Sequence, residues 1–258
     1  MKTNFHTHTY RCKHAKGSDV EYVKAAIESG IKVLGFSDHA PMPFLDGYES
    51  YFKMLPTEAE EYMSSISSLK EKYKDEIEIH VGFESEYYPT LFEDSLRLWR
   101  SLGAEYIIYG GHFSLGTEWE ASKKAAKKPS GDKELIYYTD NCIEAIKTGK
   151  FSYIAHPDIL NYTADDKELY KNSVERLVRT ANEYDTPLEL NLLGIREQRN
   201  YPSEKFWEIA APLSPKVIIG VDAHAPKNFS DKESLDAALK LAEKYKLDII
   251  NELKFKKL

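Results

Sequence analysis

The sequence lacks the features that mark several classes of protein. It contains 2 cysteines in 258 residues, too few for a disulfide framework, so intracellular free thiols are expected. No apolar run approaches a membrane span, and the first residues do not resemble a signal peptide. The net charge of −7 argues against a nucleic-acid-binding surface. We therefore expect a cytoplasmic protein that acts on a small molecule, without a nucleic-acid or membrane partner; the oligomeric state is left open.

Short apolar runs alternate with longer amphipathic runs along the chain. Seven short runs rich in Ile, Val, Phe or Tyr predict strands at 2–8, 32–37, 77–83, 106–110, 151–156, 187–192 and 216–221. Amphipathic patterns predict helices at 19–29, 57–73, 91–102, 133–148, 169–184, 203–211 and 230–245. This alternation implies parallel strands joined by crossover helices, as in an open doubly wound sheet or a closed barrel. No interdomain linker is evident, so we expect one α/β domain over residues 1–258.

Helix ends and loops carry further signals. Thr57 with Glu60, and Ser230 with Glu233, have the spacing of capping boxes. Helix C-terminal glycines are expected at Gly30, Gly103 and Gly149. No glycine-rich phosphate loop follows the first strand, which disfavours a dinucleotide-binding sheet.

The eight histidines are distributed unevenly relative to these predicted strands. Six of them lie at or just past strand C-terminal ends, and these are His6, His8, His39, His112, His156 and His224. His14 lies in the first loop and His80 in mid-strand, while Glu84, Glu86 and Asp222 add carboxylates at the same ends. The C-terminal ends of barrel strands converge on one face, so we expect seven histidines to meet there.

Seven imidazoles in one small volume indicate metal binding. Protonated rings would repel one another, whereas neutral imidazole is the commonest metal ligand in proteins. Imidazole and carboxylate donors favour Zn, Mn or Fe over Ca or Mg. So many donors exceed the needs of one ion, which implies two or three. Cys12 lies close to His14, but a structural role is the better interpretation for it.

These motifs resemble one known family. The series His6-Thr7-His8, His14, Ser37-Asp38-His39, Gly82-x-Glu84, His112, His156-Pro157 and Asp222-x-His224 is similar to the polymerase and histidinol phosphatase (PHP) family. Cys12-x-His14, Ser37-Asp38-His39-Ala40-Pro41 and Glu189-x-Asn191 with Gly194-Ile195-Arg196 resemble its monofunctional histidinol-phosphate phosphatases. The resemblance implies a distorted (β/α)7 barrel with a trinuclear metal centre at the strand C-termini.

The same resemblance implies a set of ligands for each of three ions. The first set is His6, His8, Glu84 and Asp222; the second is Glu84, His112 and His156; the third is His14, His39 and His224. His80 is left over as a structural residue, and Glu86 is expected behind the ligands or at the surface. The chain departs from the family after Asp158, where Ile159, Leu160, Asn161 and Tyr162 provide no basic residue.

The implied activity is hydrolysis of L-histidinol phosphate to L-histidinol and phosphate in histidine biosynthesis. A hydroxide between two ions about 3.5–4 Å apart, bridged by Glu84, would attack phosphorus. Arg196 would bind phosphate oxygens, since its planar fork matches phosphate geometry. Asp38 and Asp158 would orient metal-bound imidazoles, and Asp158 could also manage the proton of the leaving group.

Several alternatives share the same residues. A related phosphoesterase could act on nucleotides, oligonucleotides or phosphotyrosine with the same metal cage. An inactive metal-binding module and a barrel amidohydrolase are further candidates, although the latter would usually use a carboxylated lysine or fewer histidines. Residues 40–56 could contact an imidazole ring or simply pack over the barrel rim. The lysines within 123–128 could steer an anion, but a solvated face is the plainer interpretation.

Overall fold

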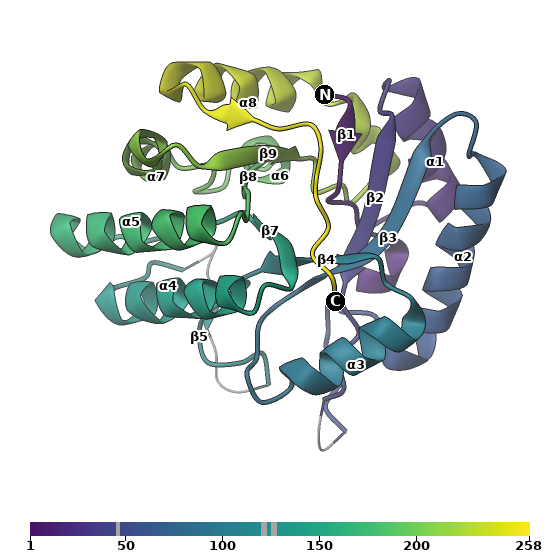
Figure 1. The fold of residues 1–258 in the computed structure, drawn as a ribbon, viewed down its shortest axis with the longest axis horizontal. Coiled ribbons are helices and arrows are strands. Elements are labelled where there is room, and N and C mark those ends of the chain that lie inside the picture. Colours follow the sequence, from purple (N-terminus) through teal and green to yellow (C-terminus); the bar gives the residue numbers. More distant parts are fainter. Residues whose placement is uncertain (45–46, 120–122, 125–127) are drawn as a thin grey trace.

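The computed structural model describes residues 1–44, 47–119, 123–124 and 128–258. Within them, eight parallel strands form one curled sheet in the order β1-β2-β3-β4-β7-β8-β9-β10 (Figure 1). Their bounds are β1 Thr3–Asn4, β2 Val33–His39, β3 Glu78–Ser85, β4 Tyr106–Gly110, β7 Phe151–Ala155, β8 Leu188–Asn191, β9 Lys216–Gly220 and β10 Asp248–Ile249. All seven predicted strands are present, and β10 is an addition that the sequence pattern did not predict.

Helices surround the outside of this sheet and connect successive strands (Figure 1). Their bounds are α1 Asp19–Glu28, α2 Ala59–Lys72, α3 Phe92–Leu102, α4 Asp132–Lys147, α5 Lys167–Glu183, α6 Leu192–Arg196, α7 Glu204–Ala210 and α8 Lys232–Tyr245. Short 3₁₀ turns lie at Tyr10–Cys12, Pro56–Glu58, Ala211–Leu213 and Pro226–Ser230. The predicted distorted barrel is confirmed, and α6 is a short helix that the sequence pattern missed. No helix among the described residues is long and apolar enough to cross a membrane.

Both predicted capping boxes are wrong. At the start of α2, a 3₁₀ turn comes first, and the Leu55 N–H donates to the Glu58 carboxylate over 2.7 Å. At α8, Asp231 is the N-cap, because its Oδ1 accepts a hydrogen bond of 3.0 Å from the Ser234 N–H. The three predicted C-terminal glycines are confirmed by positive φ angles of 80°, 83° and 65° at Gly30, Gly103 and Gly149.

A small second sheet lies outside the barrel. It pairs β5 (Phe113–Leu115) with β6 (Lys123–Lys124) in antiparallel fashion. Of the lysines that could steer an anion, Lys127 lies outside the described residues, so that interpretation stays untested.

Most buried apolar side chains fill two regions of the fold, and a small third cluster consists of Met42, Tyr88 and Leu91. One cluster lies between the sheet and its helices. The other fills the barrel interior with Phe5, Tyr106, Ile108, Tyr153, Ala155 and Ile218. The C-terminal segment crosses the sheet (Figure 1), and Phe255 stacks on Tyr106 at 4.7 Å between ring centroids. This arrangement closes the end of the barrel opposite the strand C-termini.

The barrel closes between its first and last predicted strands. Thr7 forms a parallel bridge with Ala223, supported by His8 N–H to Ala223 C=O at 3.0 Å and Ala223 N–H to His6 C=O at 3.2 Å. The His6–His8 pair therefore lies beside the Asp222–His224 pair.

Candidate metal centre

Glu84 lies at the centre of the histidine cluster. It belongs to the C-terminal part of β3 and is 1% exposed. Five imidazole nitrogens lie within 3.5 Å of its carboxylate oxygens, those of His156 (2.9 Å), His39 (3.0 Å), His8 (3.4 Å), His6 (3.5 Å) and His112 (3.5 Å). Since these residues follow four different strands, the fold brings together what the sequence separates.

Two glycines, each on the strand next to the one that carries a buried carboxylate, make room for that carboxylate. A Cβ at Gly110, on β4, would collide with the Glu84 carboxylate, and one at Gly220, on β9, would collide with Glu189. The absence of a side chain at each glycine therefore leaves the space that the carboxylate occupies.

Asp222 completes the cluster from the segment after β9. Its Oδ1 lies 3.2 Å from His8 Nε2, 3.3 Å from His224 Nδ1 and 3.6 Å from His6 Nε2. Its φ angle is +49°, a left-handed conformation that costs an aspartate free energy and is held by surrounding contacts. One such contact is from Arg196, whose Nη2 donates to the Asp222 carbonyl over 3.1 Å.

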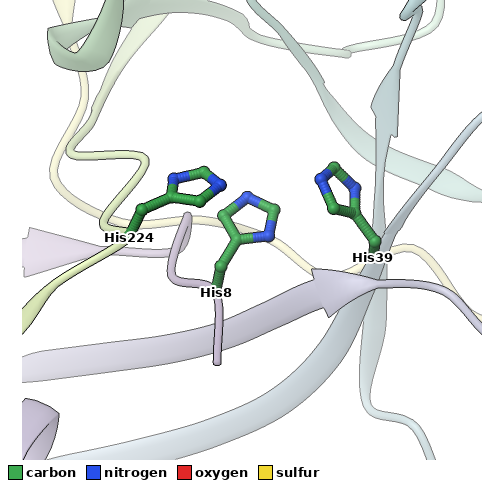
Figure 2. Close-up of side chains that lie close together, drawn as sticks. All are labelled: His8, His39 and His224. Atoms are coloured by element: carbon green, nitrogen blue, oxygen red, sulfur yellow. The ribbon is translucent and has the colours of Figure 1, made fainter. Parts of the chain in front are cut away.

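His8, His39, His14 and His224 form a second side of the cluster. Figure 2 shows the rings of His8, His39 and His224 turned toward a shared space. The His8 ring centroid lies 4.4 Å from that of His39 and 4.2 Å from that of His224. His14 Nε2 lies 3.0 Å from His224 Nε2. Two neutral rings can share such a contact, whereas two protonated rings would repel each other.

The donor atoms fit bound cations. Five buried atoms among them have no hydrogen-bond partner within the described residues: His6 Nε2, His8 Nε2, His39 Nδ1, Glu84 Oε2 and Asp222 Oδ1. Unpaired buried polar atoms are costly, and metal ions would satisfy all of them together. Three-residue groups such as His8–His39–His224, His6–His8–Glu84 and His6–His156–Asp222 have donor atoms within 4.8 Å of one another.

Charges in the cluster shift the pKa values in opposite directions. Burial opposes protonation of His6, but Asp222, Glu189 and Glu84 outweigh it and raise the pKa of that ring well above its usual value. Burial would raise the pKa of Glu84, but His112, His6 and His39 hold it well below the usual value. Burial and the neighbouring rings His224 and His8 lower the pKa of His14 to about 4. The Glu84 carboxylate is therefore held in its ionised, metal-binding form.

Two further carboxylates support the histidines from behind: Glu189, which sequence reasoning did not assign to the site, and Glu86, which it placed behind the ligands or at the surface. Glu189 Oε1 lies 2.8 Å from His6 Nδ1, and its Oε2 accepts from the His156 N–H at 2.9 Å. Glu86 Oε1 lies 2.7 Å from His112 Nδ1, which places it behind the ligands and not at the surface. Asn191 connects Glu189 to Asp222 through its Nδ2 at 2.8 and 3.1 Å. The spacing of Glu189 and Asn191, two residues apart at the end of a predicted strand, was the sequence signal that could have identified Glu189.

We expected roles beside the metals for Asp38, Asp158 and Arg196, and the structure places these three residues in different surroundings. Asp38 Oδ1 lies 3.3 Å from His8 Nδ1, as expected of a residue that orients an imidazole. Asp158 does not reach an imidazole; its Oδ2 accepts from the Ser203 N–H at 2.6 Å, and burial raises its pKa to about 7. The Arg196 guanidinium binds the Val221 and Asp222 carbonyls and Asp231 instead of facing the cavity.

A cavity of about 370 Å³ lies over the cluster. Its floor includes six of the seven clustered histidines with Glu84 and Asp222, and its walls include Tyr51, Phe52, Phe113, Ile159, Leu193, Glu197, Arg199 and Tyr201. Arg199 therefore occupies the position at the cavity that we expected of Arg196. An arginine beside a cluster of metal donors favours an anionic ligand.

Comparisons with known proteins agree with this geometry. A "Probable histidinol-phosphatase" of Deinococcus radiodurans is 25% identical over 227 residues, covering 86% of this chain and 85% of its own length. The histidinol-phosphatase of Bacillus subtilis is 30% identical over 120 residues, 44% of each chain. The structure of histidinol phosphate phosphatase from Lactococcus lactis, complexed with zinc, L-histidinol and phosphate, superposes with a TM-score of 0.73 at 17% identity over 99% of both chains. The family model described as PHP domain matches residues 4–192, so the chain belongs to the PHP domain family.

Proposed function

We propose that this protein is a metal-dependent phosphomonoesterase that hydrolyses L-histidinol phosphate to L-histidinol and phosphate. The observation that carries the proposal is the set of donors converging on Glu84 beneath a cavity that Arg199 also lines. The relatives named histidinol-phosphatase support the choice of substrate. The proposed role in amino-acid biosynthesis is also the basis for a cytoplasmic location.

The donors fit three divalent transition-metal ions, Zn, Mn or Fe. The sets expected from the sequence would hold them, with Glu84 shared between two sets. When bound, such ions supply Lewis acidity toward phosphate oxygens and lower the pKa of water. His80 is not part of this arrangement, because its two nitrogens lie 2.7 Å from Glu105 and 2.9 Å from Glu78 at the other end of β3.

The protein's own side chains position the donors and the substrate. Glu189 and Asp38 hold the Nδ1 atoms of His6 and His8, which leaves the Nε2 atoms to face the ions. Arg199 is placed to bind phosphate oxygens, because its guanidinium matches their geometry and lines the cavity. The aromatic wall formed by Tyr51, Phe52 and Phe113 offers apolar surface for the imidazole ring of the substrate.

Phosphate release from a panel of esters tests the substrate. The metal-loaded enzyme would be given L-histidinol phosphate, p-nitrophenyl phosphate, phosphotyrosine, a nucleotide bisphosphate and bis-p-nitrophenyl phosphate. We expect kcat/KM for L-histidinol phosphate to exceed the others by at least about 100-fold, because several buried contacts discriminate among the leaving groups. Equal rates with p-nitrophenyl phosphate would contradict the substrate assignment, and a preference for a nucleotide or the diester would favour the alternative phosphoesterase.

Elemental analysis tests the metal centre independently of activity. We expect about three ions per chain in the wild-type protein and about two in His14→Ala, which lacks one donor of the third set. His80→Ala is the matched control and should keep the full complement. A single ion in the wild-type protein would contradict the trinuclear proposal.

A further inference from the structure

The cavity wall carries a carboxylate that the donor cluster does not use. Among the described residues that line the cavity, the carboxylates are Glu84, Asp222 and Glu197. The first two face histidines, whereas Glu197 lies at the C-terminal end of α6. Its backbone N–H donates to the Leu193 carbonyl over 2.9 Å, and this hydrogen bond holds the Glu197 backbone against α6.

Contacts along the wall connect Glu197 to the metal centre. Arg199 Nε donates to Glu197 Oε2 at 2.9 Å, and its Nη2 contacts the same oxygen. Arg199 Nη1 donates to the Tyr201 hydroxyl at 2.9 Å. The buried Tyr201 ring lies 5.8 Å from the His156 ring. Glu197 is therefore fixed on the same wall as the guanidinium that we expect to bind phosphate.

The Glu197 side chain is accessible to a ligand in the cavity. It is 50% exposed, compared with 29% for Arg199. A carboxylate accepts up to about four hydrogen bonds, so the Arg199 contacts leave capacity for another donor. Contacts between ionised groups are also the stronger hydrogen bonds.

The charge of Glu197 is unfavourable for a ligand that is only an anion. A carboxylate beside a phosphate site repels the phosphate, and Arg199 offsets only part of this repulsion. The same carboxylate is favourable if the ligand also carries a cation at a fixed separation from its phosphate. The pair of Glu197 and Arg199 therefore matches a ligand with one group of each sign.

We propose that Glu197 binds the ammonium group of the substrate and thereby selects phosphate monoesters of amino alcohols. This inference rests on the proposed function, because L-histidinol phosphate carries its amine close to the phosphate ester. Glu197 is a specificity-determining residue, and it takes no part in bond breaking. Its contribution is greatest for substrates whose amine is protonated.

The test compares two substrates that differ only in the amine. They are L-histidinol phosphate and the analogue in which hydrogen replaces the amino group, each assayed with metal-replete wild type, Glu197→Gln and Glu208→Gln. Wild type should prefer the amine by about 10- to 100-fold in kcat/KM, the usual effect of one charged hydrogen bond. In Glu197→Gln this ratio should fall to within about threefold of one. Glu208 is exposed on α7 outside the cavity lining, so its variant should keep the wild-type ratio.

The possible failures are distinguishable. A wild-type enzyme that hydrolyses neither compound overturns the proposed function and this inference together. A wild type that hydrolyses both equally well, or a Glu197→Gln variant that still prefers the amine, overturns only the role of Glu197. Glu197→Asp keeps the charge and should restore part of the preference. A side chain that only holds Arg199 would instead change kcat/KM for both compounds alike and leave their ratio unchanged in Glu197→Gln.

Discussion

The ammonium group of Lys53 and the carboxylate of Glu86 form a buried ion pair directly behind His112. Lys53 is 1% exposed, and its Nζ contacts Glu86 Oε2 and lies 3.3 Å from Glu118 Oε2. The other Glu86 oxygen lies 2.7 Å from His112 Nδ1, while His112 Nε2 faces Glu84 at 3.5 Å. Burial opposes the charge on Lys53, but Glu86 and Glu118 outweigh it and raise its pKa. Lys53 belongs to the segment 40–56. Its ion pair with Glu86 therefore connects this segment to His112, one of the proposed metal donors.

Lys53→Met should weaken metal binding. Removing the ammonium group leaves the Glu118 carboxylate without its cation and Glu86 with its His112 contact alone, which loosens the hold of Glu86 on His112. Loss of such an outer partner typically costs about 10- to 100-fold in metal affinity, and breaking a buried pair costs about 3–5 kcal/mol of stability. Chelator competition and urea unfolding measure the two effects.

Lys74→Met is the matched control, because its pair with Glu71 is exposed on both sides. It should change stability by less than about 1 kcal/mol and leave metal affinity unchanged. If Lys53→Met kept the wild-type metal affinity, the Lys53–Glu86 pair would stabilise the segment 40–56 without affecting the metal centre.

Gly110→Ala should displace Glu84. The added Cβ would collide with the Glu84 carboxylate, so either the strand or the carboxylate must move. Overpacking of this kind costs about 1–3 kcal/mol and would separate Glu84 from its five histidines. We expect a loss of bound metal, measured by elemental analysis after dialysis. Gly131→Ala should retain its metal, since among the described residues a Cβ there would meet Glu134 alone, at 3.5 Å.

Arg196→Met distinguishes the role expected from the sequence from the one that the contacts favour. If the guanidinium chiefly holds the Asp222 backbone, the variant loses metal affinity, since Asp222 would leave its left-handed conformation. If it binds phosphate, KM rises while metal affinity stays the same. We expect the first result, with about a 10-fold loss of affinity or more by chelator competition. Arg176→Met, in an exposed pair with Asp140, should show neither effect.

Glu105 gives the protein a predictable response to acid. Burial would raise its pKa, but hydrogen bonds from His80 and Lys70 outweigh this and lower it from 4.5 to about 2. A depressed carboxyl pKa stabilises the fold above pH 4.5, and this contribution is lost as the pH falls toward 2. Because the group is partly exposed, we expect Glu105→Gln to cost about 1–2 kcal/mol near neutral pH. In urea unfolding of metal-free protein, the gap to wild type should narrow below pH 4.5 and close as the pH approaches about 2; a constant gap would contradict the assignment.

Residue spacing was sufficient for the order of the predicted elements and for the gathering of the histidines on one face, for a physical reason. Strand period and helix period differ, so each element leaves a local hydrophobic pattern. Parallel strands also share one C-terminal face, so a histidine at a strand end could be assigned to that face before any contact was known. The N-terminal ends of α2 and α8 were less predictable. Pro56 begins a 3₁₀ turn before α2, and Asp231 caps α8 in place of Ser230.

Only the tertiary structure decided which residues act behind the donors and along the cavity wall. Lys53, Glu86 and Glu189 come from separate strands and loops, and their pairing depends on distances that no local pattern encodes. Arg199, and not Arg196, lines the cavity. The Arg196 guanidinium at the end of α6 binds the Asp222 backbone, whereas the Arg199 guanidinium in the following turn contacts Tyr201. The sequence by itself determined a barrel with a histidine-rich face, since that depends on periodicity, whereas the partners of each side chain depend on packing across the whole fold.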